Sequence, residues 1–139
     1  QKDAQRQHIA HPLLLEARLL YDGGYYEHSL NRIQKINLDN LSNIHNTLEY
    51  WYRLARIQQK KMEPSKKIIE TFTKVVSINQ NSDAYYTPMS VLQIAFEYER
   101  LNDKAKAKYY YQKCLEFKNF DYERGIHQKA KVGLSRLLD

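Results

Sequence analysis

Apolar residues recur along most of the chain with the period of an α-helix. In residues 86–101, for example, Met89, Leu92, Ala95 and Phe96 follow one another at intervals of three, three and one, which places them on one helix face. No segment shows the strict two-residue alternation of a half-buried β-strand. The pattern therefore predicts an all-α fold. Clusters rich in Gly, Asn and Asp divide it into helices at 12–22, 25–37, 44–61, 64–78, 86–101, 103–117 and 122–138.

Small residues and prolines repeat in step with these helices. Ala17, Ala55 and Ala95 lie midway along the first, third and fifth helices, with separations of 38 and 40 residues. Periods of this length are typical of helical solenoids, in which small residues let two helix axes approach closely. Each of the three prolines stands just ahead of a helix-patterned run, where a missing N–H costs nothing.

The repeats share a finer spacing. The matching positions are Trp51, Leu54 and Ala55 in the second pair of helices; Val91, Ile94, Ala95, Tyr98, Ala107 and Tyr111 in the third; and Leu13, Ala17, Leu20, Ser29 and Ile33 in the first. This arrangement resembles the tetratricopeptide repeat, whose pattern is W-x2-L-G-x2-Y, then A-x3-F, then P. The resemblance covers residues 12–117.

The resemblance implies a right-handed α-solenoid of about three helix pairs, 12–37, 44–78 and 86–117, with a capping helix at 122–138. The chain departs from the family at several points. Its repeats are longer than 34 residues, Gln58 stands where the family prefers an aromatic residue, and one extra residue precedes Ile68. The closing proline is missing, with Asn119 in its place in the third pair.

Length and composition narrow the class of protein further. The 139 residues suit one domain, and four glycines with three prolines argue against collagen-like and low-complexity chains. One cysteine excludes an internal disulfide framework, and the longest apolar runs are three residues, so no membrane span is expected. Because the chain opens with QKDAQRQH, we expect it to be a fragment of a longer protein. Its compartment stays open.

Residues that could carry chemistry show no convergent pattern. The five histidines are scattered without the spacing of a metal-ligand set, and the chain has no HExxH motif. Cys114 is expected to be a buried core thiol, and Gly23-Gly24 a tight turn between helices rather than a phosphate loop. We therefore expect no catalytic residues, no metal and no cofactor, and a protein that is not an enzyme.

The formal net charge of +6 is unevenly distributed. Residues 49–81 carry seven basic and three acidic side chains, a net charge of +4, whereas residues 1–48 are balanced. A basic segment attracts acidic peptides, nucleic acid or anionic lipid, although a merely solvated basic face would look the same.

In the resembled family, the first helices of the pairs line a concave groove that holds a peptide or a partner's helix. The corresponding positions here are Leu14, Arg18 and Tyr21 in the first pair, Tyr52, Arg56 and Gln59 in the second, and Leu92, Phe96 and Arg100 in the third. The lysine and asparagine clamp of the family's chaperone-binding members is not matched. Arginines suit carboxylates, because the guanidinium group pairs with them in a fork.

The resemblance thus predicts a non-enzymatic scaffold that binds a protein or peptide segment of acidic character. We do not expect nucleic acid as the main partner. Two alternatives stay open: electrostatic binding of nucleic acid or an anionic surface through the basic second pair, and a purely structural extension of a longer array. The abundance of Lys, Asn, Ile and Tyr is typical of bacterial proteins from AT-rich genomes.

Overall fold

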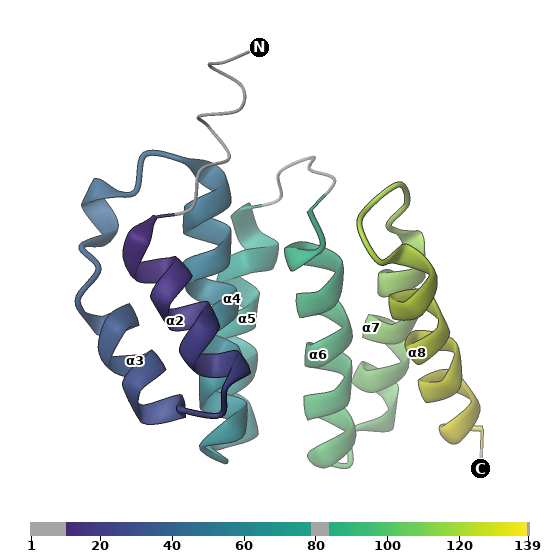
Figure 1. Cartoon of the computed structure of the whole chain (residues 1–139). Helices are drawn as coiled ribbons and strands as arrows, with labels where there is room; N and C mark the ends of the chain where they lie inside the picture. The colour runs from purple at the N-terminus through teal and green to yellow at the C-terminus, as the bar shows by residue number, and fades with distance from the viewer. Residues whose placement is uncertain (1–10, 79–83, 139) are drawn as a thin grey trace. The chain divides into compact units, whose positions relative to one another are not determined.

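The computed structural model describes residues 11–78 and 84–138, and within these ranges the chain is helical without any β-strand (Figure 1). The prediction of an all-α fold is confirmed, and each helix lies within three residues of its predicted bounds. The helices are α2 (Pro12–Asp22), α3 (Tyr26–Gln34), α4 (Ile44–Lys60), α5 (Ser65–Ile78), α6 (Tyr86–Arg100), α7 (Lys104–Glu116) and α8 (Glu123–Arg136), with a short 3-10 turn at Leu38–Asn40.

The helix starts follow from local chemistry. Pro12 is the first residue of α2, and the His11 ring Nδ1 accepts a hydrogen bond from the Leu13 N–H at 3.1 Å. Asn43 caps α4 by accepting from the His45 N–H at 2.8 Å, and Asp103 caps α7 by accepting from the Lys106 N–H. Such side-chain acceptors satisfy N–H groups that have no partner inside the helix.

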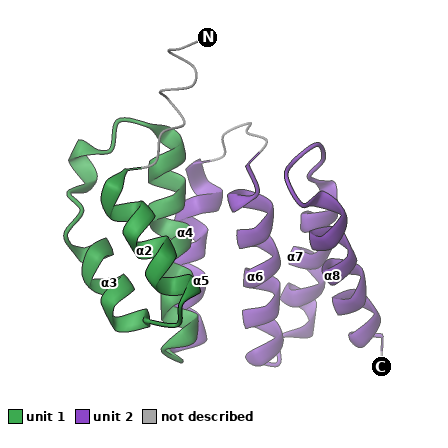
Figure 2. Ribbon diagram, viewed as in Figure 1, with its two compact units in different colours: residues 1–63 green, residues 64–139 purple. Residues whose placement is uncertain are grey.

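The chain falls into two compact units, residues 1–63 and residues 64–139 (Figure 2). The boundary lies between Glu63 and Pro64, in the turn between α4 and α5. It therefore divides the predicted second helix pair, 44–78. The arrangement of all the helices as one solenoid stays a prediction.

In unit 1, α2 packs against both α3 and α4. The core residues are Leu14, Ala17, Ile33, Ile36 and Ile57. At the closest approach of α2 and α3, the buried Ser29 hydroxyl donates a hydrogen bond of 2.7 Å to the Ala17 carbonyl oxygen. The small side chains at these two positions allow that approach, as the sequence pattern predicts.

Unit 2 is built around α6, which contacts α5, α7 and α8. Besides the face of Met89 and Leu92, the sequence has a second apolar stripe at Val91, Ile94 and Tyr98, which predicts packing on more than one side. This prediction is confirmed. The core residues are Val91, Leu92, Ala95, Ala107, Tyr111, Cys114, Phe120, Ile126 and Ala130. The Cys114 thiol is fully buried, and this burial raises its pKa to about 12, so the expected core thiol is also confirmed.

A close contact joins α7 to α8 in unit 2. A Cβ atom added at Gly133 would overlap Cζ of the buried Tyr111 ring, so only glycine fits there. The Tyr111 hydroxyl donates to Glu99 Oε1, and Arg136 Nη2 donates to Glu99 Oε1 at 2.8 Å. The bonds from Arg136 and Tyr111 hold the pKa of the Glu99 carboxyl below its usual value.

The ends of α2, α4 and α6 repeat one local structure. At each end a residue with positive φ donates its N–H to the carbonyl three residues earlier, and the next residue donates to the carbonyl five residues before it. This is the Schellman motif. The residues with positive φ are Gly24 (86°), Met62 (58°) and Asn102 (62°), at the same separations of 38 and 40 as the three alanines.

The following helices, α3, α5 and α7, repeat a buried pattern of their own. Each buries residues at the same relative positions, and the repeat length is 39 residues between successive helices. The buried sets are Ser29, Ile33 and, just after the end of α3, Ile36; Ile68, Phe72 and Val75; and Ala107, Tyr111 and Cys114. Burial therefore recurs in the register that the sequence pattern predicts.

Candidate partner-binding site

Two arginines in unit 1 share one buried carboxylate. Arg18, on α2, donates through Nε and Nη2 to the two oxygens of Glu49, on α4, at 2.8 Å each. Arg53 lies one turn further along α4, with Nη2 at 3.6 Å from Glu49 Oε2. Side-chain exposure is 4% for Glu49 and 6% for Arg53, but 36% for Arg18. The cluster therefore runs from the interior to the surface of unit 1.

Aromatic rings hold the Arg53 guanidinium. Its Cζ atom lies 5.1 Å from the centre of the Tyr21 ring and 5.6 Å from that of Tyr52, within the range of cation–π attraction. Among the described residues, however, neither Arg53 Nε nor the Tyr21 hydroxyl, both buried, has a hydrogen-bond partner. Buried polar atoms are usually paired, so these two donors mark an incompletely satisfied polar site.

The cluster combines two guanidinium groups with the Glu49 carboxylate among the described residues. Arginine donors are arranged in a fork that matches the two oxygens of a carboxylate, and hydrogen bonds between charged groups are stronger than neutral ones. The arrangement is therefore suited to binding an acidic group.

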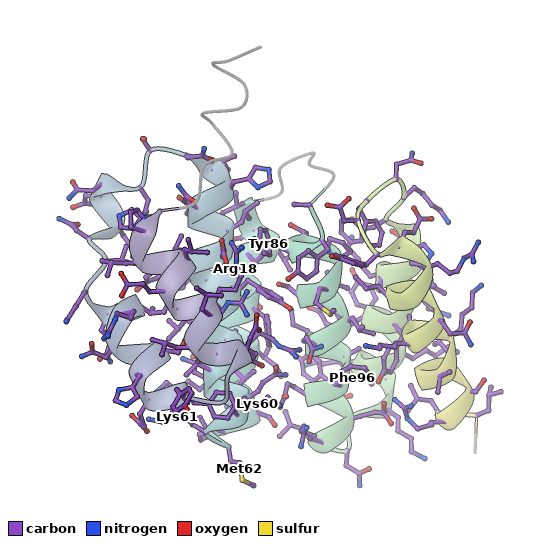
Figure 3. The ribbon with its side chains drawn as sticks, in the orientation of Figure 1. Arg18, Lys60, Lys61, Met62, Tyr86 and Phe96 are labelled. Carbon is purple, nitrogen blue, oxygen red and sulfur yellow. The ribbon has the colours of Figure 1, made fainter. Side chains whose placement is uncertain are left out.

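The predicted groove residues of unit 1 differ in how far the structure exposes them. Leu14 is 0% exposed and belongs to the core, so the expectation that it faces a partner is corrected: α3 and α4 both pack over this part of α2. Tyr52 is 3% exposed and lies against Arg53, so the expectation that it faces a partner is corrected as well. Arg18, labelled in Figure 3, remains half-exposed, as do Arg56 and Gln59 further along α4.

The predicted residues of unit 2 divide in the same way. Leu92 is 0% exposed in the core of the unit, which corrects its assignment to a partner-facing surface. Phe96 is half-buried and packs edge-on against the Tyr111 ring at 5.8 Å. Arg100 is exposed at the end of α6, 3.4 Å from Glu97 Oε2. Arg100 is thus a surface cation in unit 2, but its role in binding stays a prediction.

Sequence reasoning missed Glu49 and Arg53. Their spacing of four residues, with the acid first, is the favourable order for an ion pair on a helix, and it was the available signal. The same spacing is common on solvated helix faces. Only the packing of α2 against α4 reveals that both side chains are buried and that Arg18 joins them.

Other classes of site were sought in residues 11–78 and 84–138. These ranges contain no group of three or more His, Cys, Asp or Glu side chains that could hold a metal ion. They also contain no helix with the length and apolar character needed to cross a bilayer.

No family model, curated protein or solved structure matches the chain. Functional inference therefore depends on the residues and their geometry.

Proposed function

We propose that this chain is a tetratricopeptide-like repeat scaffold without enzymatic activity, and that it binds an acidic protein or peptide segment. Two recurrences support the repeat. The Schellman motifs after α2, α4 and α6 recur with the alanine spacing of 38 and 40 residues. The buried sets in α3, α5 and α7 recur every 39 residues.

The arginine cluster of unit 1 is the observation that carries the binding proposal. Among the described residues, Arg18 and Arg53 share the carboxylate of Glu49, and the neighbouring Arg53 Nε and Tyr21 hydroxyl are buried without a hydrogen-bond partner. A segment that only extended a longer array would have no need of this incompletely satisfied site. Arg56, one turn beyond Tyr52 on α4, extends the basic face toward the end of the helix.

In the proposed complex, a carboxylate of the partner approaches the exposed edge of Arg18 and Arg56, and the partly exposed Tyr21 ring contributes apolar contact area. Charge-assisted hydrogen bonds contribute about 1.5–3 kcal/mol each, more than the usual neutral hydrogen bond. A few such bonds together with aromatic contacts suit recognition of a short acidic segment.

The proposal is tested with a synthetic array of short peptides that contain Asp, Glu and a free C-terminal carboxylate, each matched with its Asn/Gln counterpart. Peptides that bind are then measured by calorimetry against Arg56→Ala. We expect this change to weaken binding by about tenfold or more, since it removes one charge-assisted bond. Circular dichroism should show an unchanged helical spectrum.

Lys108→Ala, on the exposed side of α7, is the matched control and should leave peptide affinity nearly unchanged. Equal losses at Arg56 and Lys108, or a loss at Lys108 alone, would move the acidic site to α7 and contradict the proposal. So would an array in which no acidic peptide binds more tightly than its Asn/Gln counterpart.

A further inference from the structure

The positive charge of the chain is concentrated in α7, α8 and the segment that connects them. Residues 104–136 contain nine Lys and Arg against three Asp and Glu, a net charge of +6, which equals the formal net charge of the whole chain. The rest of the chain is therefore balanced.

Most of these cations have no counter-charge. Arg136 pairs with Glu99, and Lys106 Nζ lies 5.5 Å from the centre of the Tyr98 ring. The others make no ion pair with another described residue, and all of them except the half-buried Lys113 are exposed. These seven cations, named the α7–α8 basic surface, are Lys104, Lys108, Lys113, Lys118, Arg124, Lys129 and Lys131.

The packing of unit 2 keeps these side chains on the outside. The apolar sides of α7 and α8 are directed into the core through Tyr111 and Ala130. Lys104 and Lys108 are one helical turn apart, so they share a flank of α7. The adjacent helix α8, visible beside α7 in Figure 1, carries Lys131 two turns after Arg124. Both helices of the hairpin thus present rows of cations.

We propose that the α7–α8 basic surface binds the phosphate backbone of single-stranded nucleic acid. This activity goes beyond the acidic-segment binding proposed for unit 1, and it departs from the sequence-based expectation that nucleic acid is not the main partner. Nucleic acid presents closely spaced negative charges along its length, which complement rows of separate cations. Neutralising them releases counterions and favours binding.

Two features distinguish this partner from other polyanions. Six of the seven cations are lysines, which act as point charges for phosphate, whereas carboxylate recognition favours the planar fork of arginine. The rings of Tyr109 and Tyr122 are 56% and 74% exposed on the same two-helix hairpin, and they offer surfaces on which unpaired bases stack. An anionic membrane would require an exposed apolar helix face, but the apolar faces of α7 and α8 are buried in the core.

The test is fluorescence anisotropy with an end-labelled oligouridylate RNA and with an RNA duplex of the same length, each titrated with the chain at increasing KCl. Four to seven phosphate contacts predict a slope of log affinity against log salt between about −3 and −5 for the single strand. The double variant Lys108→Glu, Lys131→Glu should weaken binding at least tenfold at low salt and reduce the slope by about 1.4. Tyr109→Ala should weaken binding to the single strand more than binding to the duplex.

The matched control is the double variant Lys35→Glu, Lys66→Glu, which changes the net charge equally at exposed positions, one just after α3 and one in α5. It should retain most of the affinity. Absence of RNA binding at low salt, equal losses in the two double variants, or stronger binding to the duplex would overturn the proposal. Equal competition by polyglutamate, or tighter binding to phosphatidylserine vesicles than to RNA, would also overturn it, because the partner would then be an acidic protein or a membrane.

Discussion

The two units differ in how their main buried polar clusters are paired. The Ser90 hydroxyl of unit 2 is also buried without a hydrogen-bond partner among the described residues, but it carries no charge. In unit 1, Glu49 and Arg53 are charged and buried together, and the nearby donors Arg53 Nε and Tyr21 Oη have no hydrogen-bond partner among the described residues. In unit 2, the central polar group of α7 is the Tyr111 hydroxyl, which bonds to both Glu99 and Arg136 at the edge of an apolar core.

This difference distinguishes the charged cluster of unit 1, a candidate binding site, from the hydrogen-bond network of unit 2, which supports the packing of its helices. Buried ion pairs seldom add net stability, because desolvation of the charges offsets their attraction. A unit that retains an incompletely satisfied charged cluster therefore accepts a cost that a fully apolar core avoids. The satisfied network of unit 2 instead fixes three helices, and its candidate interaction surface consists of exposed cations that cost little in the free protein.

The largest expected effect is that of Glu49→Gln. The variant leaves Arg53 buried without a counter-charge, and breaking a buried ion pair by removing one partner is strongly destabilising. We expect a loss of about 3 kcal/mol in the free energy of unfolding, at the lower end of the usual range because Arg18 is partly exposed. Urea denaturation followed by circular dichroism measures this loss.

Glu27→Gln is the control within the same unit. Glu27 Oε2 lies 2.6 Å from Lys61 Nζ, but the Glu27 side chain is 75% exposed. Exposed ion pairs contribute about 0–1 kcal/mol, so this change should have little effect. If both glutamate variants lost the same stability, burial would not be what distinguishes the Glu49 cluster from an exposed ion pair of the same unit.

The next effect concerns unit 2, where Gly133→Ala places a Cβ against the buried Tyr111 ring. Overpacking a core costs about 1–3 kcal/mol, and we expect a value in the upper half of that range because the ring is also held by its hydroxyl bonds. Gly125→Ala on the same helix has open space around its Cβ and should stabilise instead, since alanine is the better helix former. Thermal melts that shift in the same direction for both variants would show that Tyr111 does not require Gly133.

The smallest effect compares equivalent turns in the two units. Met62 in unit 1 has a φ of 58° and a side chain that is 89% exposed and projects from the turn after α4 (Figure 3). Met62→Gly should stabilise by about 1 kcal/mol, because it relieves the left-handed strain without losing packing. Asn102→Gly in unit 2 should stabilise the protein less, since asparagine tolerates the left-handed conformation better than methionine does. Chemical denaturation measures the free energy of unfolding of both variants. If both substitutions raised it equally, the strain at position 62 would not depend on the methionine side chain.

Much of the fold was predictable from the sequence because its signals are local. Helix bounds follow from apolar periodicity and from caps such as Asn43 and Asp103, each of which depends on residues within one turn. The buried alanines at 17, 55 and 95 were also predicted, since their spacing repeats along the chain. The left-handed conformation of Met62 was not predictable, because nothing in methionine favours it.

The candidate site was predictable only in part. Arg18 and Tyr21 were expected to face a partner, which stays a prediction, and the structure places both beside Arg53 or its carboxylate partner. Leu14 and Leu92 were selected from the same family pattern but are core residues. A repeat pattern identifies which face of a helix a residue occupies, but not how many other helices cover that face.

The sequence by itself therefore determined the all-α class, the helices and the repeating register, because these depend on neighbours three and four residues apart. Only the tertiary structure decided which charges are buried together. Arg18 and Glu49 are 31 residues apart, and their pairing exists because α2 packs against α4. The free-energy cost of that cluster comes from desolvation of its charges. Desolvation depends on the number of atoms that surround the charges, and these atoms come from more than one segment of the chain.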